Sequence, residues 1–131
     1  MSVLDTPGSL DQPLRVRVCR SSTAVVLALH GELDEYTTAL LTGAVDKVLA
    51  QSPPHPPGVI VDVSELTFCD SSGLGALIGV RKRLVAAERP LALVGVHGMF
   101  ERILHRTGLD QIFSCYETVA EAGRALRGVL A

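Results

Sequence analysis

Short, densely apolar segments alternate with amphipathic segments along this chain, and this alternation restricts the possible folds more than any other feature. Segments 23–30, 59–63 and 91–96 are rich in Val, Leu, Ala and Ile, as strands buried on both faces are. Segment 14–19 alternates apolar with basic residues, which predicts a strand with one exposed face. Segment 111–116 predicts a last, short strand.

Four other segments carry apolar residues at helical spacing. The first starts near Thr38, the second follows Asp70, and the third covers 98–107. The fourth opens with Thr118 and Glu121 at the spacing of a capping box. Two strands followed by helix and strand alternation predict an α/β fold, with a mainly parallel central sheet of about five strands, an antiparallel edge strand and about four helices.

The chain has 131 residues, about the length of one ordinary domain. Residues 1–13 are mostly small and polar, so we expect a flexible leader followed by a single domain over 14–131. The proline-rich segment 52–58 predicts a stiff surface connection, because proline lacks an amide donor and restricts the residue before it.

Composition excludes several kinds of partner. The formal net charge is -2 and the basic residues are scattered, so we expect no nucleic-acid partner. The longest apolar run, 24–29, is far shorter than a bilayer span, so we expect a soluble, cytoplasmic protein with no membrane partner. Cys19, Cys69 and Cys115 are far apart and lack a histidine at ligand spacing, which predicts structural thiols rather than a disulfide or a metal site.

The segment FCDSSGLG, residues 68–75, stands where the strand at 59–63 leads into the second helix. In open α/β sheets, functional groups gather at such carboxyl ends of strands. The turn GELD, residues 31–34, ends the preceding strand of the same unit. Because neighbouring parallel strands end at one edge of the sheet, we expect these two acidic turns to lie close together.

Asp70, followed by two serines, has the residue type of a helix N-cap. That interpretation leaves Gly73 and Gly75 unexplained, because glycine inside a helix costs up to about 1 kcal/mol relative to alanine. Ser72, Gly75 and Gly79 form a stripe of small residues that would let another backbone approach closely. The approaching surface could be the protein's own sheet or a partner.

Enzyme function finds little support around this segment. The short GLG is not a dinucleotide-binding loop, no P-loop lysine follows, and a GxSxG motif is absent from the sequence. We therefore expect no catalytic residue and no bound cofactor or metal. The remaining possibility is that this segment presents a hydroxyl to the active site of another protein. A phosphate on Ser71 would be favoured by the helix N-terminus. Its negative charge beside Asp70 and Asp34 would disfavour association with a partner.

Three motifs of this chain occur together in one known family. GELDEYTTALL at 31–41, VIVDVSELTFCDSSGLGALIGVRKRL at 59–84 and LVGVHGMFERILHRTGLDQIF at 93–113 resemble, in order and spacing, the STAS domains of bacterial anti-sigma factor antagonists. The resemblance covers nearly all of the chain from Leu14 onward. At 97–99, His-Gly-Met replaces the Asn-containing start that is usual in the family, so we transfer no role to that turn.

The resemblance implies a STAS fold that binds an anti-sigma factor, itself a serine kinase of the GHKL ATPase type, and so frees a sigma factor. It also implies phosphorylation of Ser71 by that kinase, which holds the ATP and Mg²⁺, and reversal by a PP2C-type phosphatase. Ser72 matches the second hydroxyl of the motif, and Asp34 matches an aspartate associated with the partner-binding surface. The predicted partner-binding residues are Asp34, Asp70, Ser71, Ser72, Gly73, Leu74, Gly75 and Arg81.

Two other functions stay open. A STAS module that is never phosphorylated could act as an adaptor in a lipid-transport or signalling assembly, and such an adaptor need not keep the serine at position 71. Nucleotide binding by the domain itself would give saturable heat on titration with ATP or GTP, and we expect none.

Overall fold

The computed structural model describes residues 3–4, 13–51 and 57–130. Its elements in chain order are β1 (Val3–Leu4), β2 (Leu14–Arg20), β3 (Ala24–Leu33), α1 (Thr38–Leu49), β4 (Gly58–Cys69), α2 (Ser71–Ala86), β5 (Leu91–Val94), α3 (Gly98–Thr107), the short 3-10 helix η1 (Leu109–Gln111), β6 (Cys115–Tyr116) and α4 (Val119–Leu130). Most of the predicted leader and of the proline-rich connection lies outside the described residues.

The strands form one sheet in the order β1-β2-β3-β4-β5-β6. β2 runs antiparallel to both β1 and β3, and the remaining pairs are parallel. The predicted α/β fold with a mainly parallel sheet, an antiparallel edge and four helices is confirmed. β1 lies in segment 1–13, where we predicted no strand. The last strand is shorter than the predicted 111–116, because η1 takes up Leu109–Gln111 and only Cys115–Tyr116 pairs with β5.

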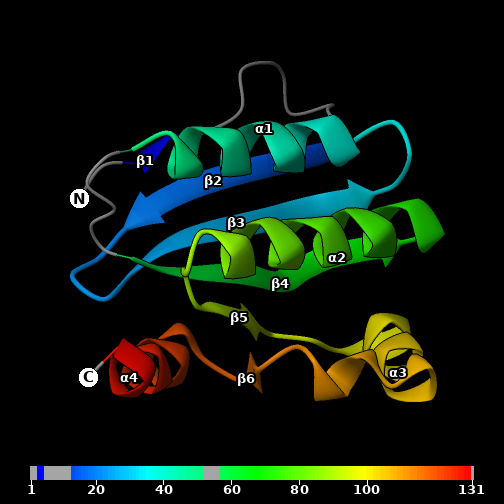
Figure 1. Ribbon diagram of the computed structural model, residues 1–131. Coiled ribbons are helices and arrows are strands. Elements are labelled where there is room, and N and C mark those ends of the chain that lie inside the picture. Colours follow the sequence, from blue (N-terminus) through cyan, green and yellow to red (C-terminus); the bar gives the residue numbers. More distant parts are fainter. Residues whose placement is uncertain (1–2, 5–12, 52–56, 131) are drawn as a thin grey trace.

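α1 and α2 lie side by side across one face of the sheet (Figure 1). Under them, the larger core cluster joins Val25 and Leu27 of β3 to Leu41 of α1 and Leu77 of α2. A smaller cluster packs α4 against the sheet and contains Ala24, Ile60, Ala92, Val94, Ala122 and Leu126. Burial on both faces explains why the central strands are almost continuously apolar.

β3 and β4 are longer than their apolar segments suggest. We predicted a turn at 31–34, but the chain stays in β3 as far as Leu33, which pairs with Cys69 of β4. Gly31 permits this extension, because its φ is +116° and a Cβ there would lie 2.0 Å from the carbonyl oxygen of Pro13. β4 likewise continues past its apolar start, so the two strands end side by side.

Arg89 is a buried polar side chain that connects separate segments. Its side chain is 4% exposed. Its Nε donates a hydrogen bond to the carbonyl of Pro57 (2.8 Å), and its Nη1 donates one to the carbonyl of Val48 in α1 (3.1 Å). The rigid guanidinium fork can serve two carbonyls in different directions, whereas a lysine ammonium is a compact point donor. Arg89 therefore links the end of α1 to the residues that lead into β4.

Arg89→Lys is expected to lower the free energy of unfolding by about 1 kcal/mol, because one of the two carbonyls that Arg89 contacts loses that hydrogen bond. Arg124→Lys, at an exposed position of α4, should change it by less than about 0.5 kcal/mol. Urea unfolding followed by circular dichroism measures both variants. Equal stability of Arg89→Lys and the parent protein would contradict the linking role.

Candidate functional site

The turns after β3 and β4 are neighbours at one edge of the sheet. Leu33 pairs with Cys69, and the backbone N–H of Asp70 donates to the carbonyl of Leu33 at 3.3 Å. Asp34 and Asp70 therefore follow adjacent strand ends, as expected from parallel pairing. In Figure 1 both strands end at the right, where α1 and α2 begin. We call Asp34 and residues 70–75 the strand-end site.

Asp70 caps α2. Its Oδ1 accepts a hydrogen bond from the N–H of Gly73 at 2.9 Å, and its backbone is extended with φ -95° and ψ -172°. Ser71 and Ser72 are the first two residues of the helix, and both are exposed. Neither hydroxyl makes a hydrogen bond to the described part of the chain. The cap thus holds two unengaged hydroxyls at the positive end of a helix.

The glycines of this segment have different structural roles. At Gly73 a Cβ would lie 2.4 Å from the carbonyl oxygen of Leu33 and 3.0 Å from the sulfur of Cys69. At Gly75 and Gly79 a Cβ would meet nothing within 4 Å. The first glycine is therefore required by the protein's own packing, whereas the other two leave open space above the helix surface. Leu74, between Gly73 and Gly75, is half-buried against the core.

Asp34 shapes its own turn. Its Oδ1 accepts hydrogen bonds from the backbone N–H groups of Tyr36 (2.9 Å) and Thr37 (3.1 Å). The buried Thr37 hydroxyl accepts from the N–H of Asp34 and donates to the carbonyl of Glu32, both at 2.9 Å. Oδ2 of Asp34 makes no hydrogen bond to the described residues, so a single carboxylate oxygen fixes the turn. The contribution of Thr37 was not predicted, although an Asp followed three residues later by Thr before a helix is a recognisable turn signal.

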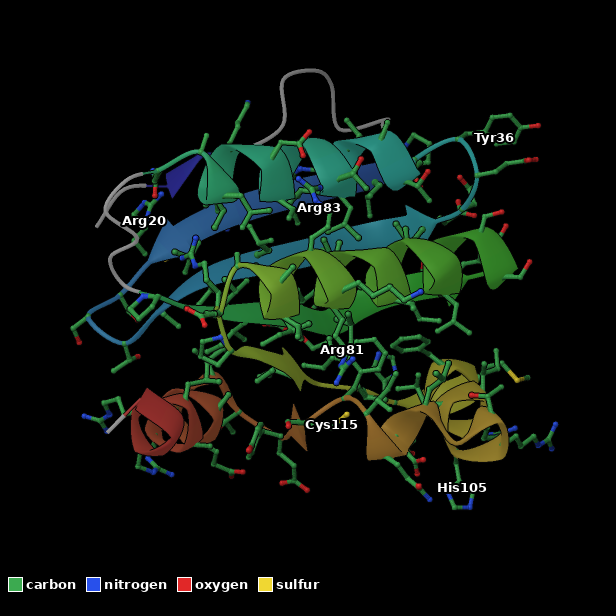
Figure 2. The ribbon with its side chains drawn as sticks, viewed as in Figure 1. Arg20, Tyr36, Arg81, Arg83, His105 and Cys115 are labelled. Carbon is green, nitrogen blue, oxygen red and sulfur yellow. The ribbon has the colours of Figure 1, made fainter. Side chains whose placement is uncertain are left out.

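Arg81 does not join the strand-end site. It lies ten residues after Ser71 on the same helix, which is about 15 Å along the axis. Its Nε donates to the carbonyl of Ile112 at 3.0 Å, and Figure 2 places its side chain on the side of α2 toward Cys115. Arg81 therefore anchors α2 to the segment after α3.

Three apolar side chains are exposed near the strand ends, and no sequence pattern predicts their exposure. Tyr36 is 84% exposed, Phe68 48% and Met99 61%. Tyr36 projects from the loop before α1 (Figure 2), Phe68 is the second-last residue of β4, and Met99 is in the first turn of α3. Their spacing in the sequence gives no hint that the fold brings Phe68 and Met99 to one groove.

Cys69 precedes the cap directly, and its chemistry is unsuited to nucleophilic attack. Burial, with a smaller contribution from the carboxylate of Asp70, raises the pKa of this thiol to about 11. The thiol is therefore protonated at neutral pH. Within the described ranges, the structure has no group of three His, Cys, Asp or Glu side chains that could hold a metal, and no helix long and apolar enough to cross a membrane.

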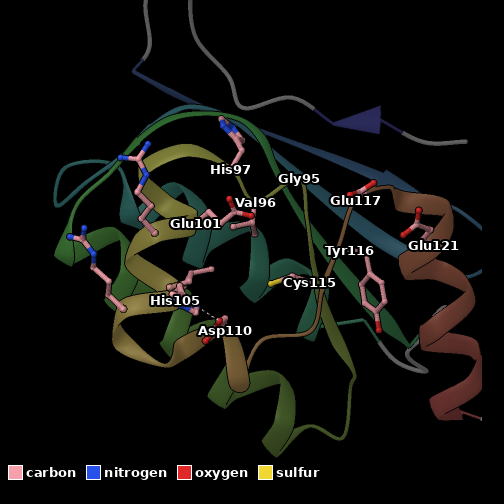
Figure 3. A pocket seen from close by; sticks show the side chains of 13 residues that line it. Gly95, Val96, His97, Glu101, His105, Asp110, Cys115, Tyr116, Glu117 and Glu121 are labelled. Carbon is pink, nitrogen blue, oxygen red and sulfur yellow. Dashed lines mark hydrogen bonds and ion pairs between the residues drawn. The ribbon is translucent and has the colours of Figure 1, made fainter.

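A hollow of about 860 Å³ lies away from the strand-end site, between α3 and α4 beside β6 (Figure 3). Cys115 points into it, and Nδ1 of His105 lies 3.1 Å from Oδ2 of Asp110 on its wall. Burial and the carboxylates of Asp110 and Glu101 raise the pKa of the Cys115 thiol. None of the predicted site residues lines this hollow.

A family model described as the STAS domain matches residues 15–122. This chain belongs to the STAS domain family. The match includes the whole strand-end site and all the strands from β3 to β6. The family resemblance that three motifs predicted is therefore confirmed.

Relatives of this STAS domain are similar over most of its length. The anti-sigma-F factor antagonist RsfB of Mycobacterium tuberculosis is 28% identical over 120 residues, which cover 92% of this chain and 95% of RsfB. The crystal structure of an anti-sigma factor antagonist from Mycobacterium paratuberculosis superimposes with a TM-score of 0.77 at 30% identity, covering 92% of this chain and 99% of that one. The unphosphorylated anti-sigma factor antagonist SpoIIAA, at 24% identity and a TM-score of 0.71, covers 86% of this chain and 96% of its own, and has the same fold.

Proposed function

We propose that this protein is an anti-sigma factor antagonist that is switched by phosphorylation of Ser71. In its unphosphorylated form it binds a kinase-type anti-sigma factor through the strand-end site and so releases a sigma factor. The observation that carries the proposal is the exposed Ser71 hydroxyl, held by the Asp70 cap at the first position of α2. The named relatives, RsfB among them, support the class of partner.

The proposed reaction needs only a hydroxyl from this chain. Ser71 Oγ attacks the γ-phosphorus of ATP bound to a GHKL-type kinase, the bond to the β-phosphate oxygen breaks, and ADP leaves. The hydroxyl proton passes to a base of the kinase. A PP2C-type phosphatase would restore the serine by hydrolysis. Because sigma factors act in transcription, we place the protein in the cytoplasm.

Phosphorylation would act on binding rather than on folding. A phosphate adds a charge of about -1.5 to -2 at the N-terminus of α2, where the helix dipole favours it. The same charge would stand beside Asp70 and close to Asp34 on a surface that must meet a partner. Added bulk and like charge both oppose association. Arg81 stays a predicted contact of the partner, although it lies apart from the strand-end site and its Nε donates to the carbonyl of Ile112.

The test is to incubate the protein with its cognate kinase and ATP and to map the phosphate by mass spectrometry. We expect one phosphate, on Ser71, and labelling at background level in Ser71→Ala. Ser72→Ala is the matched control, since it removes the adjacent exposed hydroxyl, and it should still be labelled. Undiminished labelling of Ser71→Ala would contradict the assignment. A kinase that binds the protein but never labels it would instead favour the unphosphorylated adaptor.

A further inference from the structure

One edge of β4 is left open next to the strand-end site. β5 pairs with β4 only as far as Asp62, which lies opposite Val94. β4 continues to Cys69, and no described strand pairs with this second half on the β5 side. Unpaired strand edges present backbone donors and acceptors to any extended chain that approaches. β4 therefore offers a short free edge that ends directly before Asp70.

A groove follows this edge. It has a volume of about 460 Å³ and lies between the second half of β4 and the start of α3, lined by residues 64–69 and 97–100. His97 closes one end, where its Nε2 lies 3.0 Å from the carbonyl oxygen of Ser64. The exposed side chains of Phe68 and Met99 stand on opposite walls, and Phe100 is half-buried beside them. The groove therefore combines apolar walls with backbone groups.

Carboxylates lie on and beside these apolar walls, and the basic side chains of Arg15 and Arg17 in β2 line a neighbouring hollow that shares Glu65. Glu65 lines the groove, Glu32 is the β3 residue that pairs with Phe68, and Asp70 follows its end. No lysine or arginine is among the residues that line it. An occupant with basic side chains would complement this charge. A second copy of the chain would not, since a symmetric contact would bring the same carboxylates together.

We propose that the groove binds an extended segment of the same anti-sigma factor, with an apolar side chain between Phe68 and Met99 and a lysine or arginine toward Glu65. This inference rests on the proposed function. The groove leads into the cap of Ser71, so one partner can occupy both surfaces. Strand addition at an exposed edge supplies affinity through the backbone, and side-chain pockets supply specificity.

The test compares the double variant Phe68→Ser with Met99→Ser against the control Val85→Ser. Val85 is 57% exposed on α2 and lies outside the groove, so this control removes an exposed apolar side chain elsewhere on the surface and is compared most directly with Met99→Ser alone. Calorimetric titration with the cognate anti-sigma factor should show an affinity at least about tenfold weaker for the double variant, and within about twofold of the parent for Val85→Ser. Glu65→Gln should weaken binding several-fold at low salt and reduce its salt dependence.

The outcomes separate this inference from the proposed function. Parent-like affinity of the double variant would overturn the groove and leave the switch at Ser71 intact. A parent protein that does not bind the anti-sigma factor at all would overturn both. If thermal melting shows that the double variant is unfolded, Met99→Ser alone decides, because Met99 is 61% exposed and its loss should leave folding unchanged. The proposal would also be overturned if the parent protein is a dimer, the double variant is a monomer, and both bind the anti-sigma factor equally well. A second copy of the chain would then fill the groove.

Discussion

Ser71→Asp should weaken the affinity for the cognate anti-sigma factor by at least about 100-fold, or about 2.7 kcal/mol. The added carboxylate stands at the first position of α2, beside Asp70 and near Asp34. Like charge and added bulk on a closely fitted surface both oppose association. Calorimetric titration of the anti-sigma factor into the parent protein and the variant measures the change.

The fold should tolerate the same substitution. An aspartate in the first turn of a helix is favoured by the helix dipole, and the Ser71 side chain is exposed. We expect a thermal midpoint within about 3 °C of the parent. Ser114→Asp is the control, because Ser114 is exposed in the segment before β6 and away from the strand-end site, and it should keep the parent affinity. Parent-like binding by Ser71→Asp would contradict the switch, and equal losses in both variants would show an effect unrelated to position.

The features that follow from local rules could be predicted from the sequence. Hydrophobic periodicity predicted the succession of central strands and four helices along the chain, because burial on one or two faces is encoded within each segment. The cap at Asp70 follows from the affinity of a carboxylate for the first unpaired amides of a helix. The nearness of Asp34 to Asp70 follows from parallel pairing of the strands that precede them.

The features that depend on distant segments could not be predicted in the same way. Gly31 has the residue type of a turn, yet it lies inside β3 because the carbonyl of Pro13 passes close to it. Arg81 has the pattern of an exposed helix charge, yet its Nε is engaged by Ile112. Phe68 and Met99 form one groove only because α3 starts beside the free edge of β4. No local spacing rule contains these contacts.

Gly73→Ala should lower the free energy of unfolding by about 2 kcal/mol. The new Cβ would lie 2.4 Å from the carbonyl oxygen of Leu33 and 2.9 Å from its Cγ. Neither atom can move easily, since the carbonyl accepts from the N–H of Asp70 and the side chain is fully buried. Overpacking of this kind costs up to about 3 kcal/mol, and the higher helix propensity of alanine offsets only about 1 kcal/mol of it.

Gly75→Ala, two positions further along α2, should instead raise the free energy of unfolding by up to about 1 kcal/mol, because its Cβ meets nothing within 4 Å and only the propensity gain remains. Urea unfolding of the two variants should therefore differ by about 3 kcal/mol for one added methyl group. Calorimetric titration should show that Gly75→Ala binds the anti-sigma factor several-fold more weakly than the parent. The added methyl group would occupy space on the helix surface that the proposed partner needs. Equal stabilities of the Gly73→Ala and Gly75→Ala variants would contradict the packing role of Gly73. A Gly75→Ala variant that binds the anti-sigma factor as tightly as the parent would show that Gly75 is not part of the partner surface.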